Sequence, residues 1–168
     1  MGIYGENATI INRAGANVSA GYGGYGIVAK GGTANNFGTV TTNGDYSTGM
    51  YTEGGVITNE SGGTINVSGN NTIGMAGKGI GSHIINHGTI NITGNDAIGM
   101  YGNLGTVITN TGTIDISGQN SQIFVSSDPD DPGHTVGAGT ATINGGTTAN
   151  VISSIGNIHA LPALINAG

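Results

Sequence analysis

The stretch Gly88-Thr89-Ile90-Asn91-Ile92-Thr93-Gly94 decides the fold, because it repeats an earlier stretch, Gly63-Thr64-Ile65-Asn66-Val67-Ser68-Gly69. A third copy follows as Gly112-Thr113-Ile114-Asp115-Ile116-Ser117-Gly118. Within each copy apolar and polar residues alternate, which indicates a β-strand with Ile or Val on one face and Thr or Asn on the other. A repeat of about 25 residues built from short apolar strands is typical of a stacked solenoid.

A second phrase repeats in step with the first. Ile73-Gly74-Met75 returns as Ile98-Gly99-Met100, and Thr48-Gly49-Met50 precedes both. A third strand signal, such as Ile84-Ile85-Asn86, lies between the two phrases. Corners such as Gly69-Asn70-Asn71 suit sharp bends, because Gly and Asn tolerate a positive φ angle. We therefore predict an all-β chain, a parallel β-helix of about six coils with three strands in each coil. The handedness of crossover connections favours a right-handed helix.

The repeat also suggests how the chain is organised. We expect one β-helix over residues 1–168, with regular coils at 2–125 and less regular terminal coils at 138–168. Between them, residues 126–137 combine Pro, Asp and Gly, which predicts a projecting loop. The sequence starts and stops inside the repeat, whereas a natural solenoid has capping ends, so we expect a fragment of a longer rod.

Stacking predicts which side chains share a column. One predicted buried column consists of Ile3, Ile27, Met50, Met75, Met100 and Val125. One predicted outward row consists of Glu6, Lys30, Glu53, Lys78, Asn103 and Asp128. Opposite charges on neighbouring strands contribute roughly 0.2–1 kcal/mol per pair. The two lysines are therefore interpreted as partners in this row and not as catalytic groups.

Composition excludes two classes of function. The net charge is −6, and the basic residues are Arg13, Lys30 and Lys78 alone. Nucleic-acid binding needs clustered Lys and Arg to displace phosphate counterions, so no nucleic-acid partner is expected. No run of about 18 apolar residues is present, so we expect no membrane insertion by a helix of this chain.

The repeats resemble those of type V autotransporter passenger domains. The segment from Gly63 to Gly77, GTINVSGNNTIGMAG, is closest to repeats of the large fusobacterial-type surface adhesins. The resemblance covers residues 2–125 well and 139–168 loosely. It implies a secreted virulence protein of the bacterial cell surface, anchored in the outer membrane through its own C-terminal barrel. It also implies an adhesin whose partner is a host or bacterial surface protein or glycan, with no cofactor.

Parallel β-helices also include polysaccharide lyases and hydrolases, which form the main alternative. Such enzymes need a carboxylate pair, or carboxylates that hold calcium beside a strong base. Here the acids are scattered, with Asp45 and Asp96 at corners and Asp115 on an outward position. Once the lysines are assigned to the charged row, Arg13 is the only strong base left. We therefore expect no enzyme activity and no catalytic or cofactor residue.

Asp128, Asp130 and Asp131 form a candidate metal site in the predicted loop. Their carboxylates could hold calcium, but the Gly and the distal Glu of an EF-hand loop are missing. A solvated turn is the preferred interpretation of this cluster, and no metal site is assigned.

Tyr4, Tyr51 and Tyr101 form a candidate contact site in one outward column, with Val28 and Ala76 between them. Tyrosines two coils apart, about 10 Å, can stack sugars or act as contact hot spots for a protein. The same residues can instead serve only to shield strand edges.

A lesser alternative is an ice-binding solenoid, because threonines form an outward column at positions 39, 64, 89 and 113. The next outward position along these strands is Thr41, Asn66, Asn91 or Asp115, which breaks the uniform hydroxyl face.

Overall fold

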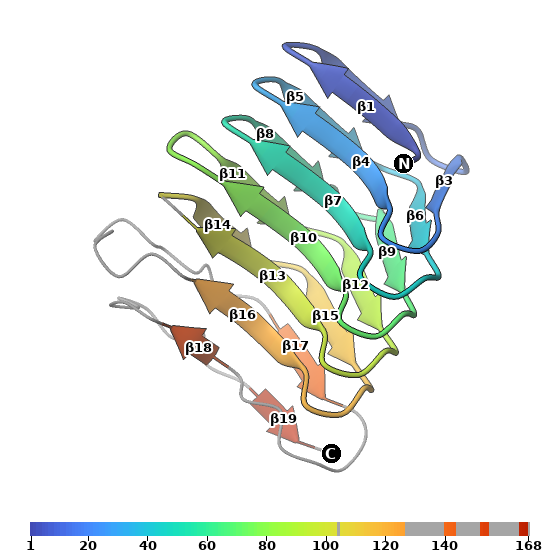
Figure 1. The fold of residues 1–168 in the computed structure, drawn as a ribbon, viewed down its shortest axis with the longest axis vertical. Coiled ribbons are helices and arrows are strands. Elements are labelled where there is room, and N and C mark those ends of the chain that lie inside the picture. The colour runs from blue at the N-terminus through green and yellow to red at the C-terminus, as the bar shows by residue number, and fades with distance from the viewer. Residues whose placement is uncertain (104, 127–139, 144–151, 155–164, 168) are drawn as a thin grey trace.

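Each of the first five coils contains three short strands separated by polar and glycine-rich corners (Figure 1). The computed structural model describes residues 1–103, 105–126, 140–143, 152–154 and 165–167. The first coil contains β1 (Ile3–Glu6), β2 (Thr9–Asn12) and β3 (Asn17–Ala20). The strands that follow are β4 (Tyr25–Lys30), β5 (Thr33–Asn36), β6 (Thr39–Thr42), β7 (Thr48–Glu53), β8 (Val56–Asn59), β9 (Thr64–Val67), β10 (Ile73–Lys78), β11 (His83–Asn86), β12 (Thr89–Ile92), β13 (Ile98–Asn103), β14 (Val107–Asn110), β15 (Thr113–Ile116), β16 (Gln122–Ser126), β17 (Thr140–Ile143), β18 (Ile152–Ser154) and β19 (Ile165–Ala167).

Every strand pairs in parallel with its equivalent in the next coil, which produces three sheets along the solenoid. Sheet A has the order β1-β4-β7-β10-β13-β16-β18. Sheet B has the order β2-β5-β8-β11-β14, and sheet C the order β3-β6-β9-β12-β15-β17-β19. The result is an all-β solenoid of about five turns with coils of roughly 24 residues, which confirms the predicted parallel β-helix, although six coils were expected. In the described ranges no helix is long and apolar enough to cross a membrane.

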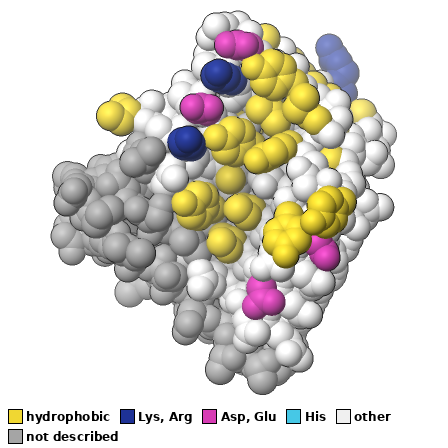
Figure 2. Space-filling view, in the orientation of Figure 1, with side chains coloured by type: hydrophobic (Ala, Val, Ile, Leu, Met, Phe, Trp, Pro, Cys, Tyr) yellow, Lys and Arg dark blue, Asp and Glu magenta, His cyan; other side chains and the backbone are white. Residues whose placement is uncertain are grey.

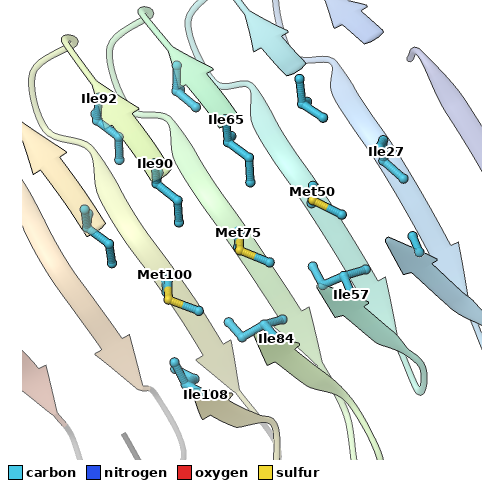
Figure 3. Close-up of a cluster of buried hydrophobic side chains, with 14 of the residues drawn as sticks. Ile27, Met50, Ile57, Ile65, Met75, Ile84, Ile90, Ile92, Met100 and Ile108 are labelled. Carbon is cyan, nitrogen blue, oxygen red and sulfur yellow. The ribbon is translucent and has the colours of Figure 1, made fainter. Parts of the chain in front are cut away.

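The core is a set of apolar columns inside the three sheets (Figure 3). Met50 pairs with Met75 and Met75 with Met100, and all three side chains are 0% exposed, which confirms the predicted methionine column. Sheet B contributes the column Ile10, Ala34, Ile57, Ile84 and Ile108, and sheet C the column Val18, Val40, Ile65, Ile90 and Ile114. Removal of this apolar surface from water is the main stabilising contribution.

The predicted end of the methionine column is wrong by one residue. Met100 pairs with Phe124, whereas Val125 pairs with Tyr101 on the outward column. The cause is a shorter corner after β13: β14 begins at Val107, four positions after β13 ends, whereas β11 begins five positions after β10 ends. β16 also continues through Ser126, the first residue of the predicted loop. The rest of that loop lies outside the described residues.

A buried asparagine ladder, which the sequence pattern did not lead us to predict, follows one edge of sheet B. The ladder consists of Asn12, Asn36, Asn59, Asn86 and Asn110, each at most 3% exposed. The Nδ2 groups of the first four asparagines each donate to the Oδ1 atom of the asparagine in the next coil, at 2.7 or 2.8 Å. Most of these amides also donate to the carbonyl oxygen of a sheet C residue, for example Asn36 to Thr64 at 3.3 Å. The ladder thereby links the end of each sheet B strand to the adjacent coils by hydrogen bonds.

The outward charged row has the predicted register on sheet A. Glu6 pairs with Lys30, Lys30 with Glu53, and Glu53 with Lys78, and Lys78 pairs with Asn103. The four charged side chains are all exposed, which confirms that they share one outward row. Among the described residues they form no ion pair with one another. Asp128, the predicted last member, lies outside the described residues.

Thr42 is a buried defect in the sheet C core. It lies between Ala20 and Val67 in an inward column, and its Oγ1 atom is buried without a hydrogen-bond partner. Because an unpaired buried hydroxyl costs about 1–3 kcal/mol, we expect Thr42→Val to raise the free energy of unfolding by about 1 kcal/mol or more.

The matched control is Thr52→Val. Thr52 is equally buried, but its Oγ1 atom donates to the Ala29 carbonyl at 2.9 Å, so its loss should cost about 1 kcal/mol. Thermal melting followed by circular dichroism compares the two variants. A Thr42→Val variant that melts below the wild type would contradict the assignment of an unpaired hydroxyl.

Candidate binding surface

The outer face of sheet A carries the predicted tyrosine column. Tyr4 pairs with Val28 and Val28 with Tyr51, while Ala76 pairs with both Tyr51 and Tyr101. The alternation of tyrosines with small residues along the solenoid axis is therefore confirmed. Although Val28 and Ala76 lie on the outward column, they are only 8% and 4% exposed. The larger neighbouring side chains therefore stand above these two positions.

A hollow of about 340 Å³ lies between the first two tyrosines, above Val28. Its lining residues are Met1, Tyr4, Tyr25, Val28, Lys30, Tyr51 and Glu53. The Tyr25 and Tyr51 rings meet edge to face, with centroids 5.4 Å apart and an interplanar angle of 61°. Sequence reasoning missed Tyr25. A signal was present, because Tyr25 lies two positions before the core residue Ile27 and in the same column as Thr48 and Ile73.

Figure 2 shows this face as a hydrophobic area with charged groups along one side. Blue basic and magenta acidic side chains alternate there along the solenoid axis. The alternation follows from the register of Glu6, Lys30, Glu53 and Lys78. The surface therefore combines an apolar centre with a border of alternating charges along one side.

Two of the tyrosines have raised pKa values. The phenol of Tyr4 donates a hydrogen bond to Glu6 Oε2 at 2.9 Å, and this bond is the main cause of its raised pKa. Burial raises the pKa of Tyr51, and the nearby Glu53 carboxylate adds to the effect. Both phenols thus remain neutral at physiological pH, and the Tyr51 hydroxyl keeps its proton as a hydrogen-bond donor.

The described acidic residues lie on several sides of the coil. Glu6 and Glu53 are on sheet A, Asp115 is on sheet C, and Asp45 and Asp96 occupy corners as predicted. Asp45 has a structural role, since its Oδ1 atom accepts a hydrogen bond from the Asn70 backbone at 2.8 Å. Within the described ranges, no three His, Asp or Glu side chains are grouped to hold a metal ion. The aspartates at positions 128, 130 and 131 lie outside those ranges.

The threonine column also has its predicted register. Threonines 39, 64, 89 and 113 pair in succession on sheet C. The neighbouring outward row contains Asn66, Asn91 and Asp115, and the Asn91 amide donates to Asn66 Oδ1 at 2.9 Å. This face is therefore a mixed polar surface and not a uniform hydroxyl array.

Comparison with known proteins gives one result at the family level. No curated protein and no solved structure matches the chain. The model of the BigA third pectate lyase-like domain matches residues 1–98, which is more than half of the sequence. The matched part includes the tyrosine hollow, the four charged residues from Glu6 to Lys78 in the outward row, and most of the asparagine ladder. The chain belongs to the family of the BigA third pectate lyase-like domain.

Proposed function

We propose that this chain is a rigid adhesive segment of a bacterial surface protein and that it makes contact through the outer face of sheet A. Its family, a domain of a bacterial surface protein, supports the location. The observation that carries the proposal is the hollow bordered by Tyr4, Tyr25 and Tyr51 on a stack of parallel strands. The parent protein would be an autotransporter adhesin, and its partners would be surface proteins or glycans of host or bacterial cells.

The solenoid suits a stalk because its interactions are continuous along the axis. Within the first five coils, each coil is joined to the next by three parallel strand pairs and by the asparagine ladder. In such a one-dimensional array each coil is stabilised mainly by its neighbours, so stability accumulates with the number of coils. A rod of this kind holds its side-chain columns at a fixed spacing of about 4.8 Å per coil.

The tyrosines suit adhesion because each offers a large apolar surface and one polar end. Tyrosine contributes contact area with little loss of conformational entropy, which explains its frequency at binding hot spots. Tyr4 is 47% and Tyr25 39% exposed, so their rings remain available to a partner. In a purely structural role these rings would cover the small residues between them and bind nothing.

A lyase or hydrolase is the alternative that the family description favours. We propose that the chain is not an enzyme. The described carboxylates lie on sheet A, on sheet C and at corners of the coil, and the two on sheet A, Glu6 and Glu53, are two coils apart with Lys30 between them. An acid and a base that act on one glycosidic bond must stand together at the substrate. Incubation with polygalacturonate, with and without calcium, tests this view. Accumulation of unsaturated or reducing products would contradict it.

The adhesive role is tested with beads that display the chain. We expect these beads to attach to bacterial or host cells, and Tyr51→Ala to reduce the attached fraction severalfold. The control is Tyr22→Ala: Tyr22 is 77% exposed and packs on Tyr46 in a corner of the coil, outside the strands of sheet A. Both variants must melt like the wild type. Equal attachment by wild type and Tyr51→Ala would refute the assignment of the binding face.

A further inference from the structure

The charges of the row on sheet A alternate in sign along the solenoid axis, so the row is electrostatically complementary to the same row in the opposite order. From the first coil to the fourth it presents Glu6, Lys30, Glu53 and Lys78. Read backwards, the signs are opposite at every position. We propose that the partner of the sheet A face is a second copy of this chain, packed face to face and antiparallel about a two-fold axis. This inference rests on the proposed adhesive role and names its partner.

The two-fold axis runs parallel to the strands, midway between the second and third coils. A half-turn about it reverses the order of the coils and brings each outward column opposite itself. Lys30 of each copy then faces Glu53 of the other, and Glu6 faces Lys78. A two-fold interface contains each such pair twice. Lys30 and Glu53, which would meet beside the axis, are both exposed on sheet A.

The tyrosine column independently favours the same axis. The operation that pairs the charges sets Tyr51 of one copy over Val28 of the other, and Tyr4 over Ala76. Each large ring thus meets a position where the outward side chain is small and the surface is lowered. The hollow above Val28, which Tyr51 of the second copy would enter, has room for such a ring. The same arrangement therefore pairs opposite charges and sets each tyrosine ring over a smaller side chain.

Other arrangements of two copies lose these contacts. A half-turn about the solenoid axis reverses the strand direction, so the charged row would face the column that contains Tyr25 and Ile73. If the second copy slides by one coil, the two-fold axis falls on a coil and like charges face each other. A slide by two coils leaves fewer of the charges opposite a partner. Within the described residues, the four charged coils are fully paired only when the axis lies between β4 and β7.

The size of the face predicts a weak interaction that needs multiple copies. A strand of six residues spans about 20 Å, and four coils also span about 20 Å, so each copy contributes roughly 400 Å². Stable dimers bury about 800 Å² per partner. Two free copies should therefore associate weakly, while many copies on facing surfaces gain avidity. Such a contact would join cells that carry the same protein.

The test uses beads in two colours, each colour coated with one form of the chain. We expect wild-type beads to cluster, and clustering to fall at least about tenfold for Lys30→Glu and for Glu53→Lys, because each change opposes like charges twice. A mixture of Lys30→Glu beads and Glu53→Lys beads should cluster again. In that mixture the two substituted positions face each other with opposite charges, and the unchanged Glu53 of one form faces the unchanged Lys30 of the other. Clusters in the mixture should contain both colours.

Two controls separate pairing from general electrostatics. Arg13→Glu makes the same change in charge as Lys30→Glu but lies in the corner between β2 and β3, and should cluster like the wild type. Glu53→Lys reduces the net negative charge of the chain. If repulsion between negatively charged chains alone controlled clustering, this variant would cluster more than the wild type and not less. Dispersed wild-type beads, or a mixture that stays dispersed, would overturn the second copy as partner. If such dispersed beads still attach to cells through Tyr51, the proposed adhesive function stands.

Discussion

Replacement of Asn36 by alanine is expected to lower the free energy of unfolding by about 3 kcal/mol. Asn36 is 0% exposed, and its Oδ1 atom accepts a hydrogen bond from Asn12 at 2.7 Å. Its Nδ2 group donates to Asn59 Oδ1 at 2.8 Å and to the Thr64 carbonyl at 3.3 Å. The substitution removes all three bonds and leaves buried partners without water. A buried polar group left unpaired costs about 1–3 kcal/mol, so the broken ladder costs more than the bonds alone.

The control for this prediction is Asn35, the preceding residue of β5. Its side chain lies on the opposite face of the strand and is partly exposed, so Asn35→Ala should change stability by less than about 0.5 kcal/mol. The two substituted residues are adjacent in the sequence, but their side chains lie on opposite faces of β5. Thermal melting at a fixed heating rate compares them. Equal melting temperatures would show that the ladder is not a source of stability.

The asparagine ladder also shows where sequence reasoning failed. Asn36 and its equivalents come at the ends of short strands, next to glycine-rich corners, and asparagine is itself a typical corner residue. The pattern Ile10-Ile11-Asn12, repeated as Ile57-Thr58-Asn59 and Ile84-Ile85-Asn86, was a usable signal. The apolar residue two positions before each asparagine points inward, so the asparagine also points inward. A buried amide group is stable at these positions because the asparagines of adjacent coils form hydrogen bonds with it.

Features that depend on spacing alone were predicted well. The methionine column, the tyrosine column and the charged row all follow from the phrase that recurs around Ile27, Met50, Met75 and Met100, although its spacing varies between 23 (50 − 27) and 25 (75 − 50) residues. The column failed at Phe124, because a corner before it is one residue shorter and a count from Met100 does not detect this. The hollow was not predicted, since it depends on how the Tyr25 and Tyr51 rings meet above Val28. Ring packing of this kind is set by side-chain conformation and not by period.

Gly74→Ala is expected to cost about 3 kcal/mol, although alanine is normally the better strand residue. Gly74 lies in a buried glycine column of sheet A, where the backbone packs directly against sheet C. A Cβ atom there would stand 2.6 Å from the Gly99 carbonyl oxygen and 2.7 Å from Ile90 Cγ2. Neither group can move freely, because one is in a strand ladder and the other is in the core. The same contact recurs between Gly49 and Ile65, so the column sets the distance between the two sheets.

The added methyl group must push the two sheets apart or move the strand ladder out of line. Either response disturbs the methionine column beside it, since Met75 follows directly and is 0% exposed. Gly21→Ala is the control, because a Cβ atom at that corner glycine meets nothing within 4 Å and should leave stability unchanged within about 0.5 kcal/mol. Both variants are compared by thermal melting and by hydrogen exchange of the coil amides. Exchange should accelerate in β10 and its neighbours for Gly74→Ala only. If Gly74→Ala melts like Gly21→Ala, the close approach of sheets A and C is absent in solution.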